Sequence, residues 1–169
     1  MNRPYLLIGA MLGALTSLPL MALFYLGSAF AGLPFLPFVL FDWLARVLPG
    51  DVITIGIDAI VKTISVLDLG STSEAAKQLE QLMALGLVLG GGALLGFVIA
   101  WLRQRRIGES GKQIGAISGL AVFAIAFVAA SGVGFNGDPT IGLLWMAGLL
   151  VGWGAFLGHW IESETLSGA

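Results

Sequence analysis

Four long stretches without a charged side chain most constrain what this 169-residue chain can fold into. They cover residues 4–41, 81–102, 113–137 and 139–161, with lengths of 38, 22, 25 and 23 residues. Because a helix needs about 20 apolar residues to cross a bilayer core, each stretch can hold one span. We therefore predict an all-α, polytopic membrane protein that forms a single membrane domain over residues 1–169. The transmembrane helices are expected at about residues 5–31, 82–102, 114–133 and 141–159.

The composition agrees with a membrane protein and excludes several functions. Charged residues make up 11% of the chain, compared with about 25% in a soluble domain. The formal net charge of -2 argues against nucleic acid as a partner. Without cysteine, the chain cannot form disulfides, thiolate metal sites or a thiol nucleophile. No ionisable side chain falls in the middle of a predicted span, which argues against active ion transport.

The segment after the first predicted span is interrupted by Gly32, Pro34 and Pro37. Proline removes a backbone donor, so we expect residues 33–40 to lie at the membrane interface with their aromatic side chains. A cleaved signal peptide is a competing interpretation of the N-terminus, because residues 29–31 have the small-x-small form of a cleavage site. The apolar stretch is longer than the core of about 7–15 residues in a signal peptide, which favours a retained span.

The connection over residues 33–80 is predicted to carry amphipathic helices outside the bilayer. In residues 51–69, which we call the external helix, polar residues such as Asp51, Asp58 and Lys62 recur at helical steps opposite a face of Ile and Leu. Burying Asp58 and Lys62 in a bilayer would cost about 5–7 kcal/mol, which offsets the gain from the apolar residues. This helix is therefore expected on the membrane surface or against a partner. Asp42 and Arg46, one turn apart, predict a short interfacial helix before it.

The distribution of Lys and Arg predicts the orientation in the membrane. Arg3 precedes the first span, and Arg103, Arg105, Arg106 and Lys112 lie between the second and third spans. Two crossings separate these places, so they share one side, and the positive-inside rule assigns that side to the cytoplasm. We predict a multi-pass protein of the bacterial inner membrane with both termini in the cytoplasm and residues 33–80 outside.

Glycines four residues apart occur in every predicted span. Such pairs let helix backbones approach closely, which favours helix association in lipid. Two interpretations remain open: packing within one bundle, or contact with the helices of a partner subunit. Together with the polar face of the external helix, the candidate contact residues are Gly86, Gly90, Gly92, Gly96, Gly115, Gly119, Asp51, Asp58 and Lys62.

Other motifs do not predict a chemical site. Gly132, Gly134 and Gly137 have GxGxxG spacing, but they follow a membrane helix instead of a strand, so we expect a hairpin turn. The single histidine, His159, cannot supply a bis-histidine haem or a three-histidine zinc site. We predict no catalytic residue, no metal site and no cofactor bound by this chain alone. Binding of a lipid, quinone or pigment between subunits remains open.

Three segments carry a family resemblance: GLPFLPFVLFDWLARVLPGDVITIGIDAIVKTI at residues 32–64, LGSTSEAAKQLEQLMA at 69–84 and GLLWMAGLLVGWGAFLGHW at 142–160. They resemble the N-terminal membrane region of certain bacterial molybdopterin-dependent oxidoreductases of the sulfite-oxidase-like kind. In that family a soluble cofactor-binding domain follows the last helix, and no segment of this sequence matches it, so no catalytic residue carries over. The resemblance implies a non-catalytic membrane subunit that anchors or scaffolds a redox (electron-transfer) complex, with other membrane subunits and lipids as partners. The alternative is a free-standing small membrane protein, such as a passive carrier or lipid-associated factor.

Overall fold

The computed structural model describes residues 3–50, 54, 58, 62, 72–105, 110–134 and 138–167. The helices are α1 (Arg3–Ala31), α2 (Leu36–Val47), α4 (Thr72–Arg105), α5 (Gly111–Val133) and α6 (Pro139–Ser167). The predicted all-α fold class is thereby confirmed. Four segments are long and apolar enough to cross a membrane: Tyr5–Ala31, Gln81–Arg105, Gly111–Val133 and Pro139–Ser163. The chain is a polytopic membrane protein with four candidate spans.

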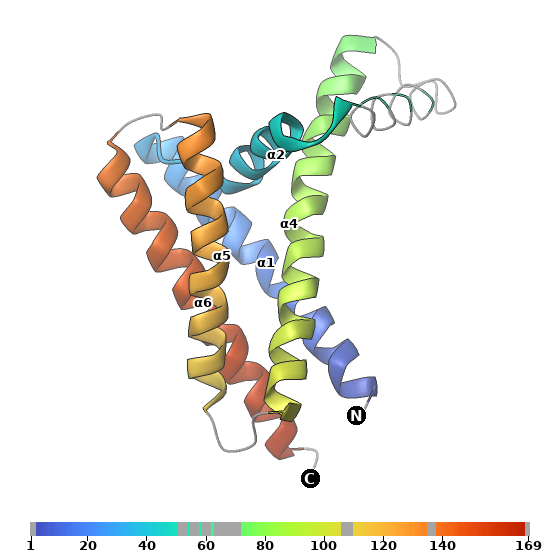
Figure 1. Cartoon of the computed structure of the whole chain (residues 1–169), viewed down its shortest axis with the longest axis vertical. Coiled ribbons are helices and arrows are strands. Elements are labelled where there is room, and N and C mark those ends of the chain that lie inside the picture. Colours follow the sequence, from blue (N-terminus) through green and yellow to red (C-terminus); the bar gives the residue numbers. More distant parts are fainter. Residues whose placement is uncertain are drawn as a thin grey trace.

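The four long helices form a bundle with two distinct ends (Figure 1). We call the end where α1 and α5 begin and α4 and α6 end the terminal end. The opposite end, which carries α2, the end of α5 and the start of α6, is the loop end (Figure 1). The most extensive contacts join α1 with α4 and α5 with α6, so the bundle consists of two helix pairs. Direct contacts between α4 and α5 are much sparser.

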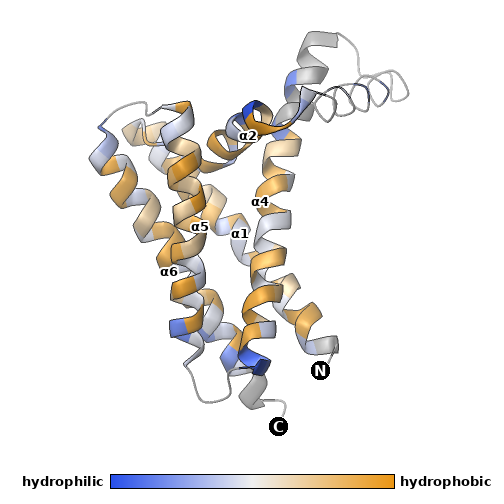
Figure 2. Cartoon of the chain, viewed as in Figure 1, coloured by the Kyte–Doolittle hydropathy of each residue, from blue (hydrophilic) through white to orange (hydrophobic). Residues whose placement is uncertain are grey.

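Hydrophobic residues dominate the middle of the long helices, and hydrophilic residues gather at the two ends (Figure 2). Arg103, Lys112 and Glu162 lie at the terminal end, whereas Asp42 and Arg46 lie at the loop end. This distribution is the one expected when the middle of the bundle faces hydrocarbon and charged side chains remain near water.

The short helix α2 lies across the loop end and packs on α4 and α5. Its start is determined by Pro37, which stands in the first turn, where a missing N–H costs no hydrogen bond. Leu36 and Pro37 are buried, while Asp42 and Arg46 form an ion pair of 2.9 Å on the exposed face. Residues 36–40 of the predicted interfacial segment and the predicted short helix therefore belong to one amphipathic helix, and residues 33–35 precede it.

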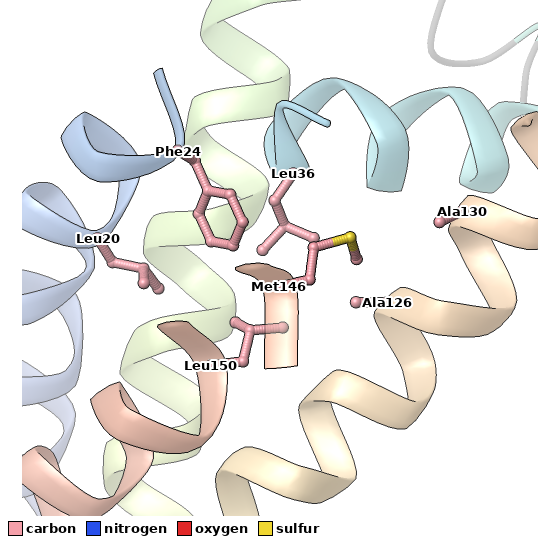
Figure 3. Packing of buried hydrophobic residues seen from close by; sticks show 7 residues of the cluster. All are labelled: Leu20, Phe24, Leu36, Ala126, Ala130, Met146 and Leu150. Atoms are coloured by element: carbon pink, nitrogen blue, oxygen red, sulfur yellow. The ribbon is translucent and has the colours of Figure 1, made fainter. Parts of the chain in front are cut away.

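One buried cluster holds α2 against three of the spans (Figure 3). Leu36 of α2 packs among side chains from α1, α5 and α6. The buried members of the cluster are Leu20, Phe24, Leu36, Ala126, Ala130, Met146 and Leu150. A second cluster, nearer the terminal end, includes Leu6, Ile99, Ile114 and Leu157 from all four long helices.

Within the external connection, the structure describes Thr54, Asp58 and Lys62, which are helical and exposed. Their spacing of four residues places them on one helix face, in agreement with the predicted polar face. The Thr54 hydroxyl donates a hydrogen bond of 2.9 Å to the carbonyl oxygen of Gly50. Asp51, the other predicted contact residue of this helix, lies outside the described residues.

Candidate functional site

Glycines of α1 and α4 bring the backbones of these two helices into direct contact. A Cβ added at Gly9 would lie 2.6 Å from the carbonyl oxygen of Gly96. One added at Gly92 would lie 2.6 Å from the carbonyl oxygen of Gly13. Real Cβ atoms do not approach this closely, so a side chain at either position would force the helices apart. Gly92 and Gly96 thus serve the internal packing of the bundle.

The backbones of α5 and α6 are also brought into direct contact by glycines. A Cβ at Gly154 would lie 2.8 Å from the Cα of Gly119, and one at Gly158 would lie 2.9 Å from the Cα of Gly115. Both predicted contact residues of α5, Gly115 and Gly119, are buried in this interface. Close backbone approach gives the van der Waals packing that joins helices in lipid.

Gly86 and Gly90 differ from the other predicted contact glycines. Both are exposed, and no atom of the described residues would come within 4 Å of a Cβ added at either position. They lie on α4 between the exposed side chains of Met83 and Phe97. Gly86 and Gly90 thus leave two exposed positions on one face of α4 without a side chain, and we call this place the α4 notch.

Inside the bundle, an indole bridges the two helix pairs. Trp153 of α6 donates a hydrogen bond of 3.0 Å from Nε1 to the Thr16 hydroxyl of α1. The Thr16 hydroxyl donates in turn to the carbonyl oxygen of Leu12 at 2.8 Å. Since water cannot satisfy these groups in hydrocarbon, the internal partners remove the cost of burying them. The sequence offered no local signal for this pair, whose members are 137 residues apart.

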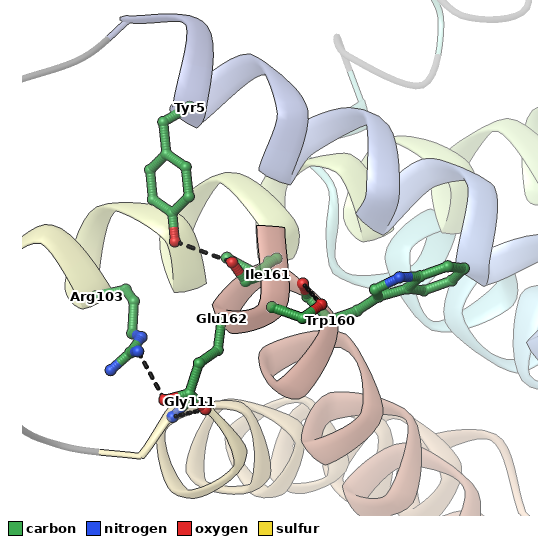
Figure 4. A network of polar contacts seen from close by, with 7 residues as sticks. Tyr5, Arg103, Gly111, Trp160, Ile161 and Glu162 are labelled. Carbon is green, nitrogen blue, oxygen red and sulfur yellow. Dashed lines mark hydrogen bonds and ion pairs between the residues drawn. The ribbon is translucent and has the colours of Figure 1, made fainter. Parts of the chain in front are cut away.

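A polar cluster ties the helices together at the terminal end (Figure 4). Arg103 donates to Glu162 Oε1 at 2.7 Å, and the backbone N–H of Gly111 donates to Oε2 of the same carboxylate at 3.0 Å. Glu162 therefore caps the N-terminus of α5, where a negative charge is favourable. Tyr5 of α1 donates to the carbonyl oxygen of Ile161 at 3.4 Å. These contacts are structural, and they hold the ends of α1, α4, α5 and α6 in register.

A long groove lies between α4 and α5, where the two helix pairs meet. Its volume is about 550 Å³, and its walls are almost entirely apolar. From α4 it is lined by Gly91, Val98 and Leu102, and from α5 by Ile117, Ala121 and Ile125. Leu36 and Leu40 of α2 line its loop end, and Leu150 and Trp153 of α6 line its floor. We call it the seam groove.

A second pocket, of about 490 Å³, opens at the loop end between α1, α2 and α4. Tyr25, Phe35 and Phe38 line it in edge-to-face contacts, with ring centroids 6.2 Å and 4.9 Å apart. Gln81 supplies its polar rim. The predicted interfacial segment, residues 33–40, thus forms one wall of this pocket through Phe35 and Phe38.

The remaining motifs do not assemble a chemical site in the described part of the chain. His159 is exposed on α6, and Met146 is buried far along the same helix. Among the described residues, no group of three or more His, Asp or Glu side chains could hold a metal ion. Gly134 ends α5 with a φ of 97°, which suits glycine, while residues 135–137 of the predicted hairpin lie outside the described part.

Fold and surfaces together define a polytopic α-helical membrane protein with a glycine-packed bundle and an open seam. Comparison with protein-family models, curated proteins and solved structures found no match. The resemblance to the membrane region of molybdopterin-dependent oxidoreductases therefore stays a prediction from the sequence.

Proposed function

We propose that this chain is a non-catalytic membrane subunit that anchors or scaffolds a redox complex in the bacterial inner membrane. The α4 notch is the observation that carries the scaffolding role. On another face of α4, Gly92 and Gly96 have the same spacing and receive α1 in direct backbone contact. The α4 notch offers Gly86 and Gly90 for an equivalent approach by a helix of another subunit.

The exposed polar residues of the loop end supply a second contact surface for a partner. Asp58 and Lys62 lie on the external helix, and the Asp42–Arg46 ion pair lies on the outer face of α2. Because Leu36 anchors α2 in the buried cluster, the Asp42–Arg46 part of this surface is fixed on the bundle. Charged groups on such a surface favour specificity and orientation of a partner more than raw affinity.

The redox assignment rests on the resemblance of residues 32–64, 69–84 and 142–160 to the membrane region of molybdopterin-dependent oxidoreductases. A subunit of this kind would position a cofactor-bearing partner at the membrane, with both termini in the cytoplasm.

The test is site-specific photo-crosslinking of the protein in its native membrane, followed by gentle extraction. A photoreactive residue at Gly90 should link to one discrete membrane subunit, and the same residue at Ala124, exposed on α5, should not. G86L and G90L should release that subunit, whereas A124L should retain it. Recovery of a lone protomer in every case would refute the scaffold and favour a free-standing membrane protein. A stable partner without any redox centre would refute the redox assignment alone.

A further inference from the structure

The seam groove has the dimensions of a channel for one hydrocarbon chain. Along α4 it extends from Leu87 to Leu102, and 15 residue steps of about 1.5 Å give a length of about 22 Å. A volume of about 550 Å³ over that length corresponds to a mean width of 5–6 Å. The carbon atoms of a methylene chain pack against neighbouring carbon atoms at a distance of about 4 Å, so one such chain fits within this width. A helix, about 10 Å across, does not fit.

The lining of the groove matches an acyl chain along its whole length. Leu, Val, Ile, Ala and Gly form the two walls, and Ser118 turns its hydroxyl to the carbonyl oxygen of Ile114 of its own helix at 2.8 Å. The Trp153 indole N–H on the floor is likewise engaged, by Thr16. The Ser118 hydroxyl and the Trp153 N–H thus have partners within the protein. A bound molecule without hydrogen-bonding groups would leave both hydrogen bonds intact.

The two ends of the groove differ, and this difference determines the orientation of a chain bound in it. At the loop end, Leu36 and Leu40 of α2 cover it. At the terminal end, Leu102 is the last lining residue of α4, and Arg105 follows one helical turn later on the same side. A chain in the groove therefore has its polar end at Arg105.

Arg105 is a cation available to a negatively charged group. Its side chain is exposed and lies over the Trp101 ring, 4.1 Å from the centroid, which holds it near the helix surface. It forms no ion pair with a described carboxylate, whereas the neighbouring Arg103 is engaged by Glu162. Lys112 is also exposed at the start of α5 and adds positive charge to this end.

From this geometry we propose that the seam groove binds one anionic phospholipid. One acyl chain lies between α4 and α5, and the phosphate lies at the terminal end beside Arg105. Basic pockets between transmembrane helices on the cytoplasmic side recognise anionic headgroups in this manner. The predicted orientation places the terminal end in that leaflet. This site is independent of the scaffold role, because the α4 notch lies on a different face of α4 from the groove lining.

The experiment uses the full chain purified in mild detergent, with phosphatidylglycerol as the anionic probe and phosphatidylcholine of the same acyl chains as the neutral one. Native mass spectrometry should show one phosphatidylglycerol retained per protein. Saturating phosphatidylglycerol should raise the Tm by about 5 °C more than phosphatidylcholine does. G91L, which places a side chain in the groove where no described atom lies within 4 Å, should abolish both effects.

Two further variants separate the chain site from the headgroup site. R105Q should weaken phosphatidylglycerol binding about fivefold and leave phosphatidylcholine unchanged. R46Q, which removes the same charge at the loop end, and G152L, which adds the same side chain at an open position of α6, should bind as the wild type does. A121L fills the groove from α5 and replaces G91L if that variant does not fold. Equal effects of the two lipids, or retention of phosphatidylglycerol by both groove-filling variants, would overturn the proposal.

Discussion

Replacing single glycines of α6 by alanine tests the close packing of the helix pairs most directly. Gly154 and Gly152 are two residues apart, so alanine should improve helix propensity at both by about 0.5–1 kcal/mol. At Gly152 no described atom lies within 4 Å of the new Cβ, and the gain remains. At Gly154 the Cβ would lie 2.8 Å from the Cα of Gly119, which is backbone and cannot turn away.

The helices must therefore separate in G154A, and overpacking of this kind costs about 1–3 kcal/mol. The propensity gain is common to both variants and cancels, so the free energy of unfolding should be about 1–3 kcal/mol lower in G154A than in G152A. Reversible unfolding in mixed micelles, or steric trapping in bilayers, measures this difference. Equal stabilities of the two variants would refute the assignment of Gly154 to a backbone contact, because helix propensity alone treats both positions alike.

Three other perturbations test separate parts of the structure. A double-mutant cycle of Thr16→Val and Trp153→Phe should give a coupling energy of about 0.6 kcal/mol, and up to about 1.7, measured by the same unfolding assay. E162Q should lower the free energy of unfolding by about 1–2 kcal/mol, because a neutral amide caps α5 more weakly and leaves Arg103 without its counter-charge. Unchanged stability, which is the result expected if the Arg103–Glu162 pair were fully solvated, would contradict this. L36A should cost about 2–5 kcal/mol and speed hydrogen exchange in α2 far more than in α5, whereas uniform exchange would show that Leu36 does not anchor α2.

The parts of the fold that depend on local sequence were predictable. The four spans follow from the lengths of the uncharged stretches, and the Asp42–Arg46 pair follows from a spacing of one helical turn. The ends of the helices were less accurate: α5 begins at Gly111, three residues before its predicted start. Part of the reason is that its first turn is capped by Glu162, a residue 51 positions away in sequence.

The partners of the glycines could not be predicted, because spacing alone does not identify the face that a neighbour covers. From the sequence, Gly90 and Gly92 are equally good candidates for a helix contact, yet Gly90 is exposed and Gly92 lies against α1. The choice depends on the rotation of α4 in the bundle, which is determined by residues distant in sequence. For the same reason the Trp153–Thr16 hydrogen bond had no signal in either segment.

The seam groove follows from the way in which the bundle divides its small and large side chains. Within each helix pair, glycines remove the side chains that would separate the backbones, so the pairs close tightly. Between α4 and α5, the facing surface of α4 carries Leu and Val and that of α5 carries Ile and Val. The volume of these side chains holds the two helices apart, and α2 covers the opening at one end only. A rigid pair cannot adjust its width without breaking backbone contacts, whereas the seam can change by repacking side chains. A chain bound between α4 and α5 can therefore be accommodated by repacking side chains, without breaking the backbone contacts inside either helix pair.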